Sequence, residues 1–587
     1  MKILITITKI RWLKISSPYD KKIWIKSYDA HVKPNLEYPT ESLGILFDKA
    51  MSKFPDRIAC YFMENEMTFR ELRNKVHRFA TFLQKNGLKK GDRVGINLAN
   101  CPQYLVAHFG TILAGGVASG CSPLLSPTEL AYQLNDSEAK FFVTLDAIYE
   151  KVLVKILDKI PKLNCVITTN ISDYMGLSKL KIALGKLLKK IPKGKVIPFE
   201  GKKVLDFLEV MNTEIDLKNV DIDVEKDLVL LQYTGGTTGL PKGTELTHKN
   251  IISNTIQIIT WIDTYEAKEG EVNLSAFPLF HLAGLAMSMV TLYVSAGQIL
   301  IANPRDSGHI IKEMERRPRL LVNVPTLYLN IKNNPKAKSI PESTLDAIEI
   351  YISGAAPFPA EAIRDFEKSM NAVNKVLEVY GMTETSPILT MNPFKGTKKI
   401  GTVGLPMPDT NIRLVDVDTG EQVPLGKAGE IVCKGPQVTS GYYNKPEANK
   451  QTIIDGWFHT GDVGIMDEDG YLRIVDRTKD MLIVSGFKVY SVHVEDVLTK
   501  HPDIELVAII GLPDADRPGS EIVKAIVQLK ESIQPTESIK ENLKKYATEH
   551  LSKYENPKIW EFTEEMPLTA VGKVLKRALR DKEKKAQ

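Results

Sequence analysis

The chain has 587 residues and a formal net charge of +5, and 43% of its residues are hydrophobic and 25% charged. A chain of this length is too long for one hydrophobic core, so we expect at least two domains of a soluble globular protein. The lysines are dispersed, and the small positive charge therefore gives no reason to expect a nucleic-acid partner. The five cysteines lack pairing or metal-ligand spacing, which suits a reducing, cytoplasmic location and predicts neither disulfides nor zinc.

Two apolar stretches resemble targeting or membrane segments. Near the N-terminus, Lys9 and Arg11 interrupt an apolar run before a secretory signal is complete, so we expect no signal peptide. Residues 272–304 contain no Asp, Glu, Lys or Arg, but Pro278 and Gly284 break the run. We therefore expect a buried strand, turn and helix inside a large domain rather than a membrane span.

Helix and strand patterns alternate through the first part of the chain. Helical spacing is found at residues 41–52 and 68–86. Short buried strands are expected at 94–98, 141–144 and 165–168. This alternation predicts an α/β fold with mostly parallel sheets.

The stretch from Leu177 to Lys193 has the pattern of a basic amphipathic helix, which Pro192 should end. At 100° per residue its large apolar residues share one arc of about 100°, and its lysines, apart from Lys181, occupy the opposite arc. We expect this helix to lie on a membrane surface; the alternative is a helix packed on the protein with a solvated lysine face. The two sets are Leu177, Leu180, Leu184, Leu187, Leu188 and Ile191, and Lys179, Lys186, Lys189, Lys190 and Lys193.

The most informative stretch is 233–243, which follows a buried apolar run at 228–231 and concentrates glycine, threonine and lysine. Glycines beyond a strand let backbone N–H groups approach an anion, and hydroxyls and an ammonium add donors, so this composition predicts a phosphate-binding loop. A P-loop is disfavoured because a proline precedes Lys242 and a glycine follows it. Thr247 should cap the next helix.

The later part of the chain changes character twice. Residues 411–435 form short runs with turn signals, as in a small β-rich subdomain. A strand at 471–475 is followed by a highly charged pentapeptide and then by a compact α+β unit. We therefore predict an N-terminal domain at 1–475, a hinge at 476–480 and a C-terminal domain at 481–587.

The stretch 233–243 and four further segments carry motifs in chain order. They are Tyr233-Thr234-Gly235-Gly236-Thr237-Thr238-Gly239-Leu240-Pro241-Lys242-Gly243, Tyr380-Gly381-Met382-Thr383-Glu384, His459-Thr460-Gly461-Asp462, Asp476-Arg477-Thr478-Lys479-Asp480 with Gly486-Phe487-Lys488, and Leu568-Thr569-Ala570-Val571-Gly572-Lys573. Together they resemble the adenylate-forming superfamily of acyl-CoA synthetases, coumarate ligases, luciferases and peptide-synthetase adenylation domains. The similarity covers nearly the whole chain, and it is strongest to bacterial-type long-chain fatty acid–CoA ligases.

The resemblance implies a site for ATP and Mg²⁺. Thr234 and Glu384 would place the metal ion, which prefers oxygen ligands. Asp462 would accept hydrogen bonds from the ribose hydroxyls, Tyr380 would stack on adenine, and Arg477 would contact ribose or phosphate. The implied ATP-binding residues are Thr234, Gly235, Gly236, Thr237, Thr238, Gly239, Lys242, Tyr380, Gly381, Met382, Thr383, Asp462 and Arg477.

The same resemblance implies a mobile C-terminal domain that takes part in both steps of the reaction. Lys573 would reach between the carboxylate and the α-phosphate of ATP only when the domain is closed. Rotation about Lys479 would then bring Gly486 and Lys488 to the site, where Gly486 would leave room for the pantetheine arm of CoA and Lys488 would meet a CoA phosphate. Ser491 stands where the family usually has proline.

The acid would bind in an apolar pocket. By resemblance, Phe280 and His281 lie at its mouth and Ser353, Gly354 and Ala355 line it, with His281 placed among the catalytic residues alongside Lys573, Glu384 and Thr234. The apolar residues of 282–289 offer no partner for an α-amino group, which favours a hydrocarbon acid over an amino acid.

We therefore predict an AMP-forming long-chain fatty acid–CoA ligase. The alternatives within the enzyme class are a medium-chain or aryl acid–CoA ligase and a ligase that loads an acyl carrier protein. From another class, the chain could be a non-catalytic fatty-acid carrier or scaffold, against which the intact Lys573, Glu384 and Asp462 argue. A membrane surface and, in a homodimer, a second copy of the chain are the further partners considered.

Overall fold

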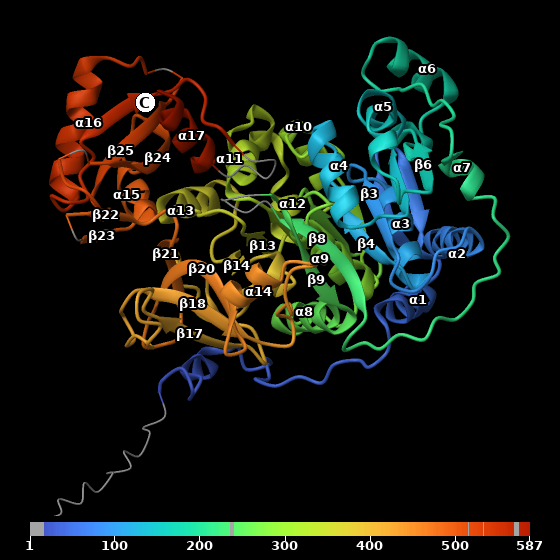
Figure 1. The fold of residues 1–587 in the computed structure, drawn as a ribbon, viewed down its shortest axis with the longest axis horizontal. Coiled ribbons are helices and arrows are strands. Elements are labelled where there is room, and N and C mark those ends of the chain that lie inside the picture. Colours follow the sequence, from blue (N-terminus) through green and yellow to red (C-terminus); the bar gives the residue numbers. More distant parts are fainter. Residues whose placement is uncertain are drawn as a thin grey trace, which may run out of the picture.

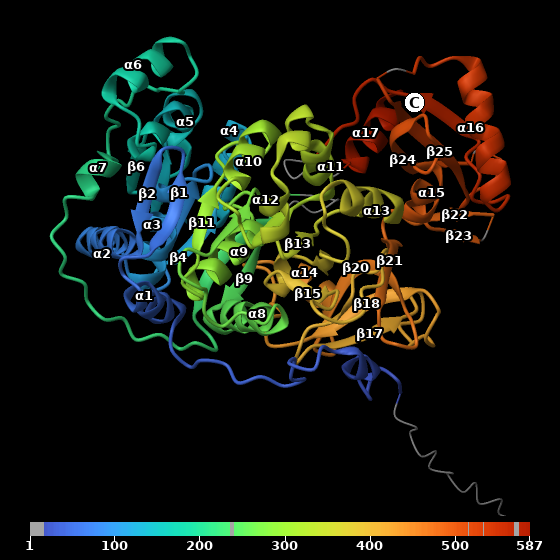
Figure 2. The ribbon, with the colours of Figure 1, turned by 180° about the vertical axis from the view of Figure 1, so that it is seen from behind.

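The computed structural model describes residues 17–234, 240–485, 487–514, 516–531, 533–568 and 574–586. Two α/β sheets and a β-rich subdomain form a large body, and a smaller C-terminal unit lies to one side of it, beyond β21 (Leu472–Arg477) (Figure 1). Figure 2 shows from behind that α6 (Lys179–Leu187) lies at the opposite end of the molecule from this unit. The predicted fold class, α/β with a small α+β C-terminal unit, is confirmed.

The first sheet has the strand order β7-β6-β5-β3-β4-β8-β9 and is parallel except for the β8–β9 pair. Every residue of β5 and β6 is buried, as expected of parallel strands covered on both faces. The strands are β3 (Arg93–Asn97), β4 (Val117–Gly120), β5 (Phe141–Leu145), β6 (Cys165–Thr169), β7 (Lys203–Asp206), β8 (Leu228–Thr234) and β9 (Lys242–Thr247). The helices of this region are α2 (Phe69–Lys85), α3 (Pro102–Leu113), α4 (Pro127–Asp136), α5 (Asp146–Lys151) and α7 (Phe207–Val210).

The second sheet has the order β16-β15-β14-β13-β12-β10-β11-β1-β2, and it recruits β1 and β2 from the start of the chain. Its strands are β1 (Ile58–Phe62), β2 (Asn65–Thr68), β10 (Val272–Ser275), β11 (Gly297–Leu300), β12 (Leu320–Asn323), β13 (Ile350–Ser353), β14 (Val376–Gly381), β15 (Ile388–Met391) and β16 (Leu405–Pro406). Its helices are α1 (Leu43–Lys53), α8 (His248–Trp261), α9 (Leu282–Tyr293), α10 (Ser307–Met314), α11 (Pro325–Asn333), α12 (Glu342–Ala347) and α13 (Ala360–Ser369).

The apolar stretch at 272–304 contains the predicted strand and helix, β10 and α9, inside this domain, and a second strand, β11, that was not predicted. Among the described residues, no helix is long and apolar enough to cross a membrane. Thr247 caps α8 as predicted, and the backbone N–H of Asn250 donates to its hydroxyl at 3.2 Å. Strand β9 was not anticipated; it pairs with β8 across the glycine-rich loop, so that Thr234 lies opposite Lys242.

The β-rich subdomain expected from 411–435 is present and extends further along the chain. It contains β17 (Asn411–Val415), β18 (Gly429–Lys434), β19 (Ile453–Ile454), β20 (Trp457–Met466) and β21, with α14 (Pro446–Thr452) beside it. The C-terminal unit contains β22 (Leu482–Val484), β23 (Phe487–Val489), α15 (Ser491–Leu498), β24 (Ile504–Pro513), β25 (Glu521–Leu529), α16 (Glu537–His550), β26 (Ile559–Phe562) and α17 (Lys576–Ala586). It has its own apolar core between β24, β25, α15 and α16.

Helix α6 is shorter than the predicted helix over Leu177 to Lys193. It ends at Leu187, before the expected stop at Pro192, because Lys189 adopts a left-handed φ of 56°. The chain then folds back, with the N–H groups of Lys190 and Ile191 donating to the carbonyl of Gly185 at 2.9 and 3.0 Å. Ile191 is thereby buried, and it leaves the apolar face of the predicted helix.

Candidate active site

Three residues predicted to bind the nucleotide meet where β14, β20 and β21 lie near one another. The hydroxyl of Tyr380 donates to Asp462 Oδ2 at 2.8 Å, and Arg477 Nε donates to Asp462 Oδ1 at 3.1 Å. Asp462 is 6% exposed, and its carboxylate raises the pKa of the Arg477 guanidinium. The carboxylate is therefore held in place before any ligand arrives.

The local backbone explains how Asp462 is presented. Gly461 has a φ of +73°, which glycine adopts without strain. The N–H of Asp462 donates to Thr460 Oγ1 at 3.1 Å, and the Thr460 hydroxyl donates to the carbonyl of Ile431 at 2.8 Å. On β14, a Cβ at Gly381 would lie 1.9 Å from the Pro387 carbonyl oxygen, so this position requires glycine.

Glu384, the predicted metal ligand, lies in the short turn Thr383–Thr385 and is 7% exposed. Burial raises the pKa of its carboxyl group. Tyr442 Oη donates to Glu384 Oε1 at 2.9 Å and is the polar partner that orients this carboxylate. A buried carboxylate whose charge is disfavoured by burial gains from a cation beside it.

Tyr442 also connects Glu384 to the phosphate-loop strand. Lys242 Nζ lies 5.0 Å from the centre of the Tyr442 ring, in a cation–π contact. The N–H of Tyr443 donates to the carbonyl of Gly243 at 2.8 Å, which ties this segment to β9. Sequence reasoning missed Tyr442, and the aromatic pair after Gly441 was the only signal for it.

Residues on either side of the glycine-rich loop form hydrogen bonds with other parts of the large body. Tyr233 Oη donates to Asp136 Oδ2 at 2.7 Å, and Lys445 Nζ donates to Asp136 Oδ1 at 2.6 Å. The hydroxyl of Tyr132 donates to the carbonyl of Pro241 at 2.9 Å. The predicted phosphate-binding residues Gly235, Gly236, Thr237, Thr238 and Gly239 lie outside the described residues.

Phe280 and His281 lie directly before α9, at the predicted mouth of the acid pocket. His281 is the N-cap residue of α9, and its carbonyl accepts from the N–H of Leu285 at 3.0 Å. Gln232 of β8, a second residue that sequence reasoning missed, donates from Nε2 to the Phe280 carbonyl at 2.9 Å. This bond joins β8, which precedes the predicted phosphate-binding loop, to the predicted mouth of the acid pocket.

Ser353, Gly354 and Ala355 follow β13. Ser353 is 2% exposed and its hydroxyl has no hydrogen-bond partner among the described residues. A Cβ at Gly354 would lie 2.5 Å from Val379 Cγ2, so glycine permits the close packing of β13 against β14. Ala355 has a φ of 67°, a left-handed conformation that costs free energy in any residue other than glycine.

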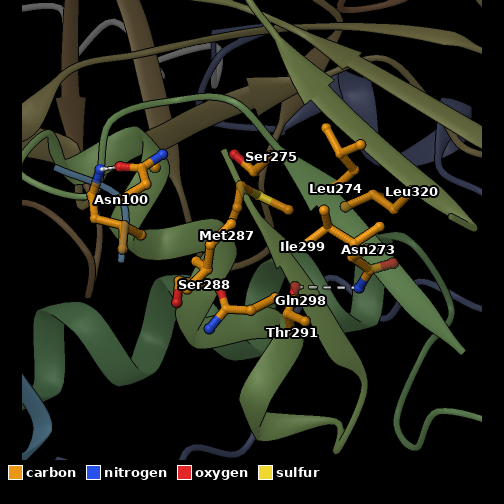
Figure 3. Close-up of a pocket in the computed structure, with 13 residues that line it drawn as sticks. Asn100, Asn273, Leu274, Ser275, Met287, Ser288, Thr291, Gln298, Ile299 and Leu320 are labelled. Carbon is orange, nitrogen blue, oxygen red and sulfur yellow. Dashed lines mark hydrogen bonds between the residues drawn. The ribbon is translucent and has the colours of Figure 1, made fainter. Parts of the chain in front are cut away.

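A small cavity lies between α9 and strands β10 and β11, lined by both polar and apolar side chains (Figure 3). Its volume of about 10 Å³ is close to that of one water molecule. Within the described structure, four polar atoms around it have no partner, and buried polar groups of this kind are commonly satisfied by a water molecule. They are Asn273 Oδ1, Ser275 Oγ, Ser288 Oγ and Gln298 Nε2.

The structure does not place the predicted hinge residue or the predicted residues of the C-terminal unit in the cluster around Asp462. Lys488 of β23 faces the turn between β17 and β18, where its Nζ lies 2.9 Å from Asp418 Oδ2. Lys479 is exposed in the turn that follows β21. Gly486 and Lys573 fall outside the described residues, and so the structure does not place the predicted catalytic lysine.

Comparison with known proteins identifies the family of the chain. Residues 47–443 match the family model of the AMP-binding enzymes, and residues 493–573 match the AMP-binding enzyme C-terminal domain. The chain therefore belongs to the AMP-binding enzyme family, as its motifs predicted.

Individual proteins of known name are also similar to the chain. The chain is 35% identical over 572 residues to the long-chain-fatty-acid–CoA ligase of Bacillus subtilis (strain 168), covering 96% of this chain and 98% of the relative. It is 34% identical over 520 residues to a feruloyl-CoA synthase of Amycolatopsis sp., covering 88% and 93%. Among solved structures, ATP-bound MatB from Rhodopseudomonas palustris has a TM-score of 0.77 at 29% identity, covering 92% of this chain and 99% of the other.

Proposed function

We propose that the protein is an AMP-forming long-chain fatty acid–CoA ligase. In the first step a fatty-acid carboxylate oxygen attacks the α-phosphorus of ATP, and the bond to the β-phosphate breaks to release pyrophosphate. In the second step the sulfur of CoA attacks the acyl carbon, and the acyl–phosphate C–O bond breaks to release AMP. The observation that carries the proposal is the cluster of Tyr380, Asp462 and Arg477 beside buried Glu384.

The nucleotide roles follow from this cluster. Asp462 would accept hydrogen bonds from the ribose hydroxyls, and Tyr380 and Arg477, which already contact it, would hold the carboxylate at a fixed angle. Lys242 and the neighbouring glycine-rich residues would bind the phosphates. Charge on the phosphates would thus be balanced by donors of the protein, and such electrostatic stabilisation supplies much of enzymatic rate enhancement.

Glu384 and Thr234 fit a Mg²⁺ ion. Glu384 offers a buried carboxylate with Tyr442 on one oxygen, and Thr234 adds a hydroxyl at the end of β8. When bound, Mg²⁺ would neutralise phosphate charge and favour release of pyrophosphate. Tyr442 would keep the carboxylate from rotating away from the phosphates.

The acid pocket favours a hydrocarbon chain. Within α9, Leu282, Leu285 and Met289 are apolar and buried, so they offer no polar partner to a substrate. His281 and Phe280 stand at its mouth, where Gln232 fixes the backbone. The relatives named long-chain-fatty-acid–CoA ligase support an acyl substrate of this type.

The C-terminal domain would supply Lys573 in the first step and Gly486 and Lys488 in the second, after rotation at the hinge 476–480. Lys488 would enter the active site only in the second orientation. In the structure its Nζ instead contacts Asp418 in the β17–β18 turn, which supports the first orientation.

Pyrophosphate and AMP release measured with acids of graded chain length, with and without CoA, tests the proposal. We expect acid-dependent pyrophosphate release with long-chain acids, and acyl-CoA only when CoA is present. Preference for aryl or medium-chain acids, or for an acyl carrier protein in place of CoA, would identify one of the alternative ligases. No AMP with any acid would indicate a non-catalytic carrier.

We further propose that α6 and the segment after it contact an anionic membrane surface. No residue of α6 is buried, which argues against the packed-helix alternative. Leu180 is 80% exposed and Leu187 76%, with Leu184 and Leu188 also exposed. The same segment carries lysines without a single acidic residue between Gly176 and Phe199, so apolar and basic groups share one surface.

Sedimentation with anionic vesicles tests the membrane contact. Changing Lys186, Lys189 and Lys190 to glutamate should abolish co-sedimentation, because each lysine near an anionic surface contributes about 1 kcal/mol. The matched control changes Lys540, Lys544 and Lys545 of α16 to glutamate, which gives the same net charge at the other end of the molecule. Equal vesicle binding by both variants would contradict the proposal, and activity on detergent-dispersed acid should be retained.

A further inference from the structure

Ser491, the first residue of α15, makes contacts that a proline at this position could not make. It is 0% exposed. Its Oγ donates to Asp476 Oδ1 at 2.9 Å, and its backbone N–H donates to the other oxygen of the same carboxylate. Proline has neither a hydroxyl nor an N–H, so it could form neither bond; alanine would keep the backbone bond and lose the bond from Oγ.

Lys576, the first residue of α17, continues the network. Its Nζ donates to Ser491 Oγ at 2.8 Å and lies 2.7 Å from Glu495 Oε1. Glu495 also accepts from the N–H of Ile509 at 2.6 Å. The side chains of Lys576 and Glu495 are 13% and 17% exposed, so these charges are largely removed from water and each has a partner.

The network crosses the boundary between the two parts of the molecule. Asp476 belongs to β21, which pairs with β20 in the large body, whereas Ser491 and Lys576 belong to α15 and α17 of the C-terminal unit. A second link joins Arg580 of α17 to Asp480 at 2.7 Å. Helix α17 is thus attached at two points to the segment that was predicted to be the hinge.

Helix α17 is also attached to the base of the segment that contains Lys573. Leu568 and Val574 form an antiparallel bridge, and the N–H of Leu575 donates to the carbonyl of Pro567 at 2.7 Å. Lys576 follows immediately. Its contacts with Ser491 therefore fix the point at which the chain leaves this segment.

We propose that Ser491 is a positioning residue for the adenylation step, which holds the C-terminal unit in its present orientation by linking Asp476 to Lys576. The inference rests on the proposed function, in which Lys573 acts in the first step and the unit then rotates. That rotation must break both bonds between Ser491 and Asp476. The link therefore favours the first half-reaction and opposes the second.

The test compares the two half-reactions in Ser491→Ala and Ser491→Pro. Loss of hydrogen bonds to a charged group should slow acid-dependent pyrophosphate release about tenfold or more, while conversion of supplied acyl-AMP and CoA to acyl-CoA is unchanged or faster. Ser253→Ala is the matched control, because Ser253 is also 0% exposed but its hydroxyl has no partner among the described residues. Lys576→Met should resemble Ser491→Ala, and Lys576→Arg should restore the first half-reaction.

A second readout does not depend on activity. All five native cysteines are buried, so spin labels on Val373→Cys in the large body and Glu549→Cys in α16 report the distance between the two parts. Ser491→Ala should shift or broaden the distance distribution of the wild type. An unchanged distribution, or equal slowing of both half-reactions, would overturn the inference. Absence of acid-dependent pyrophosphate release in the wild type would instead refute the proposed function, and the distance measurement would still decide the role of Ser491.

Discussion

The two regions that would form the active site are held by different kinds of contact. Tyr380, Asp462 and Arg477 lie on strands of the large body and its edge, and they are within hydrogen-bond distance of one another. Lys488 and Lys576 of the C-terminal unit instead contact Asp418 and Ser491 through polar bonds that cross or adjoin the boundary. Changes in the first region should therefore impair nucleotide binding directly, whereas changes in the second should separate the two half-reactions.

The largest separation is expected from Lys573→Ala. Loss of one preorganised charge donor should slow adenylation by roughly two to three orders of magnitude, while acyl-AMP supplied as substrate should still be converted to acyl-CoA. The measurement is pyrophosphate release beside thioester formation from synthetic acyl-adenylate. Equal loss of both activities would mean that Lys573 supports the fold or both orientations.

Glu384→Gln tests the region in the large body. It should slow adenylation by about a hundredfold, within the range for removal of a preorganised charged group, and raise the Mg²⁺ concentration needed for half-maximal rate. Added Mg²⁺ that fully restores the wild-type rate at low concentration would contradict the metal assignment.

Glu384→Gln should slow adenylation but should also make the folded protein more stable at neutral pH. Burial raises the folded-state pKa of Glu384 above its unfolded value, so the stability it contributes is greatest below the unfolded pKa and is lost as pH rises through the folded pKa. At neutral pH the ionised carboxylate therefore costs stability, and Glu384→Gln should raise Tm in the absence of Mg²⁺. If the Tm of the variant at pH 7 is lower than that of the wild type, other groups of the protein must stabilise the ionised carboxylate of Glu384.

Lys479→Pro tests the rotation itself. Proline restricts φ, and so thioester formation should slow by roughly tenfold while acid-dependent pyrophosphate exchange is retained. Unchanged overall turnover would rule out Lys479 as the hinge.

Asp418→Asn should give the smallest effect. It removes the charge of the nearer of two carboxylates beside Lys488, Asp418 at 2.9 Å and Asp416 at 3.9 Å, and leaves Lys488 itself intact. Exposed ion pairs are worth about 0–1 kcal/mol, so adenylation should change by at most about fivefold. The difference from the wild type should disappear in about 1 M salt, where charges are screened within about 3 Å. A larger effect that persists in high salt would indicate a structural role for Asp418.

The sequence predicted the fold class and the family because motifs and periodicity are local. Resemblance also pointed to Tyr380, Asp462 and Arg477, which the structure brings together from strands far apart in the chain. It could not reveal Tyr442 or Gln232, whose roles arise from contacts to Glu384 and Phe280 across 58 and 48 residues. No local pattern encodes such contacts.

Helix α6 and Ser491 show two further limits of sequence reasoning. The periodicity of 177–193 was read as one helix, but the packing of Ile191 against Gly185 ends the helix early. In the sequence, Ser491 stands out only as a departure from the proline that the resemblance leads us to expect. Its bonds to Asp476 became visible when the hinge and α15 were placed side by side.

In the second sheet, β1 pairs with a strand that is synthesised much later than β1 itself. Cys60 of β1 lies opposite Gln298 of β11, about 240 residues later in the chain. On the ribosome, β1 can reach its parallel neighbour only after those residues have emerged, which takes roughly 10 to 50 seconds at 5–20 residues per second. Until then one edge of Ile58–Phe62 lacks its parallel neighbour β11, and an unpaired strand edge of this kind is prone to aggregation.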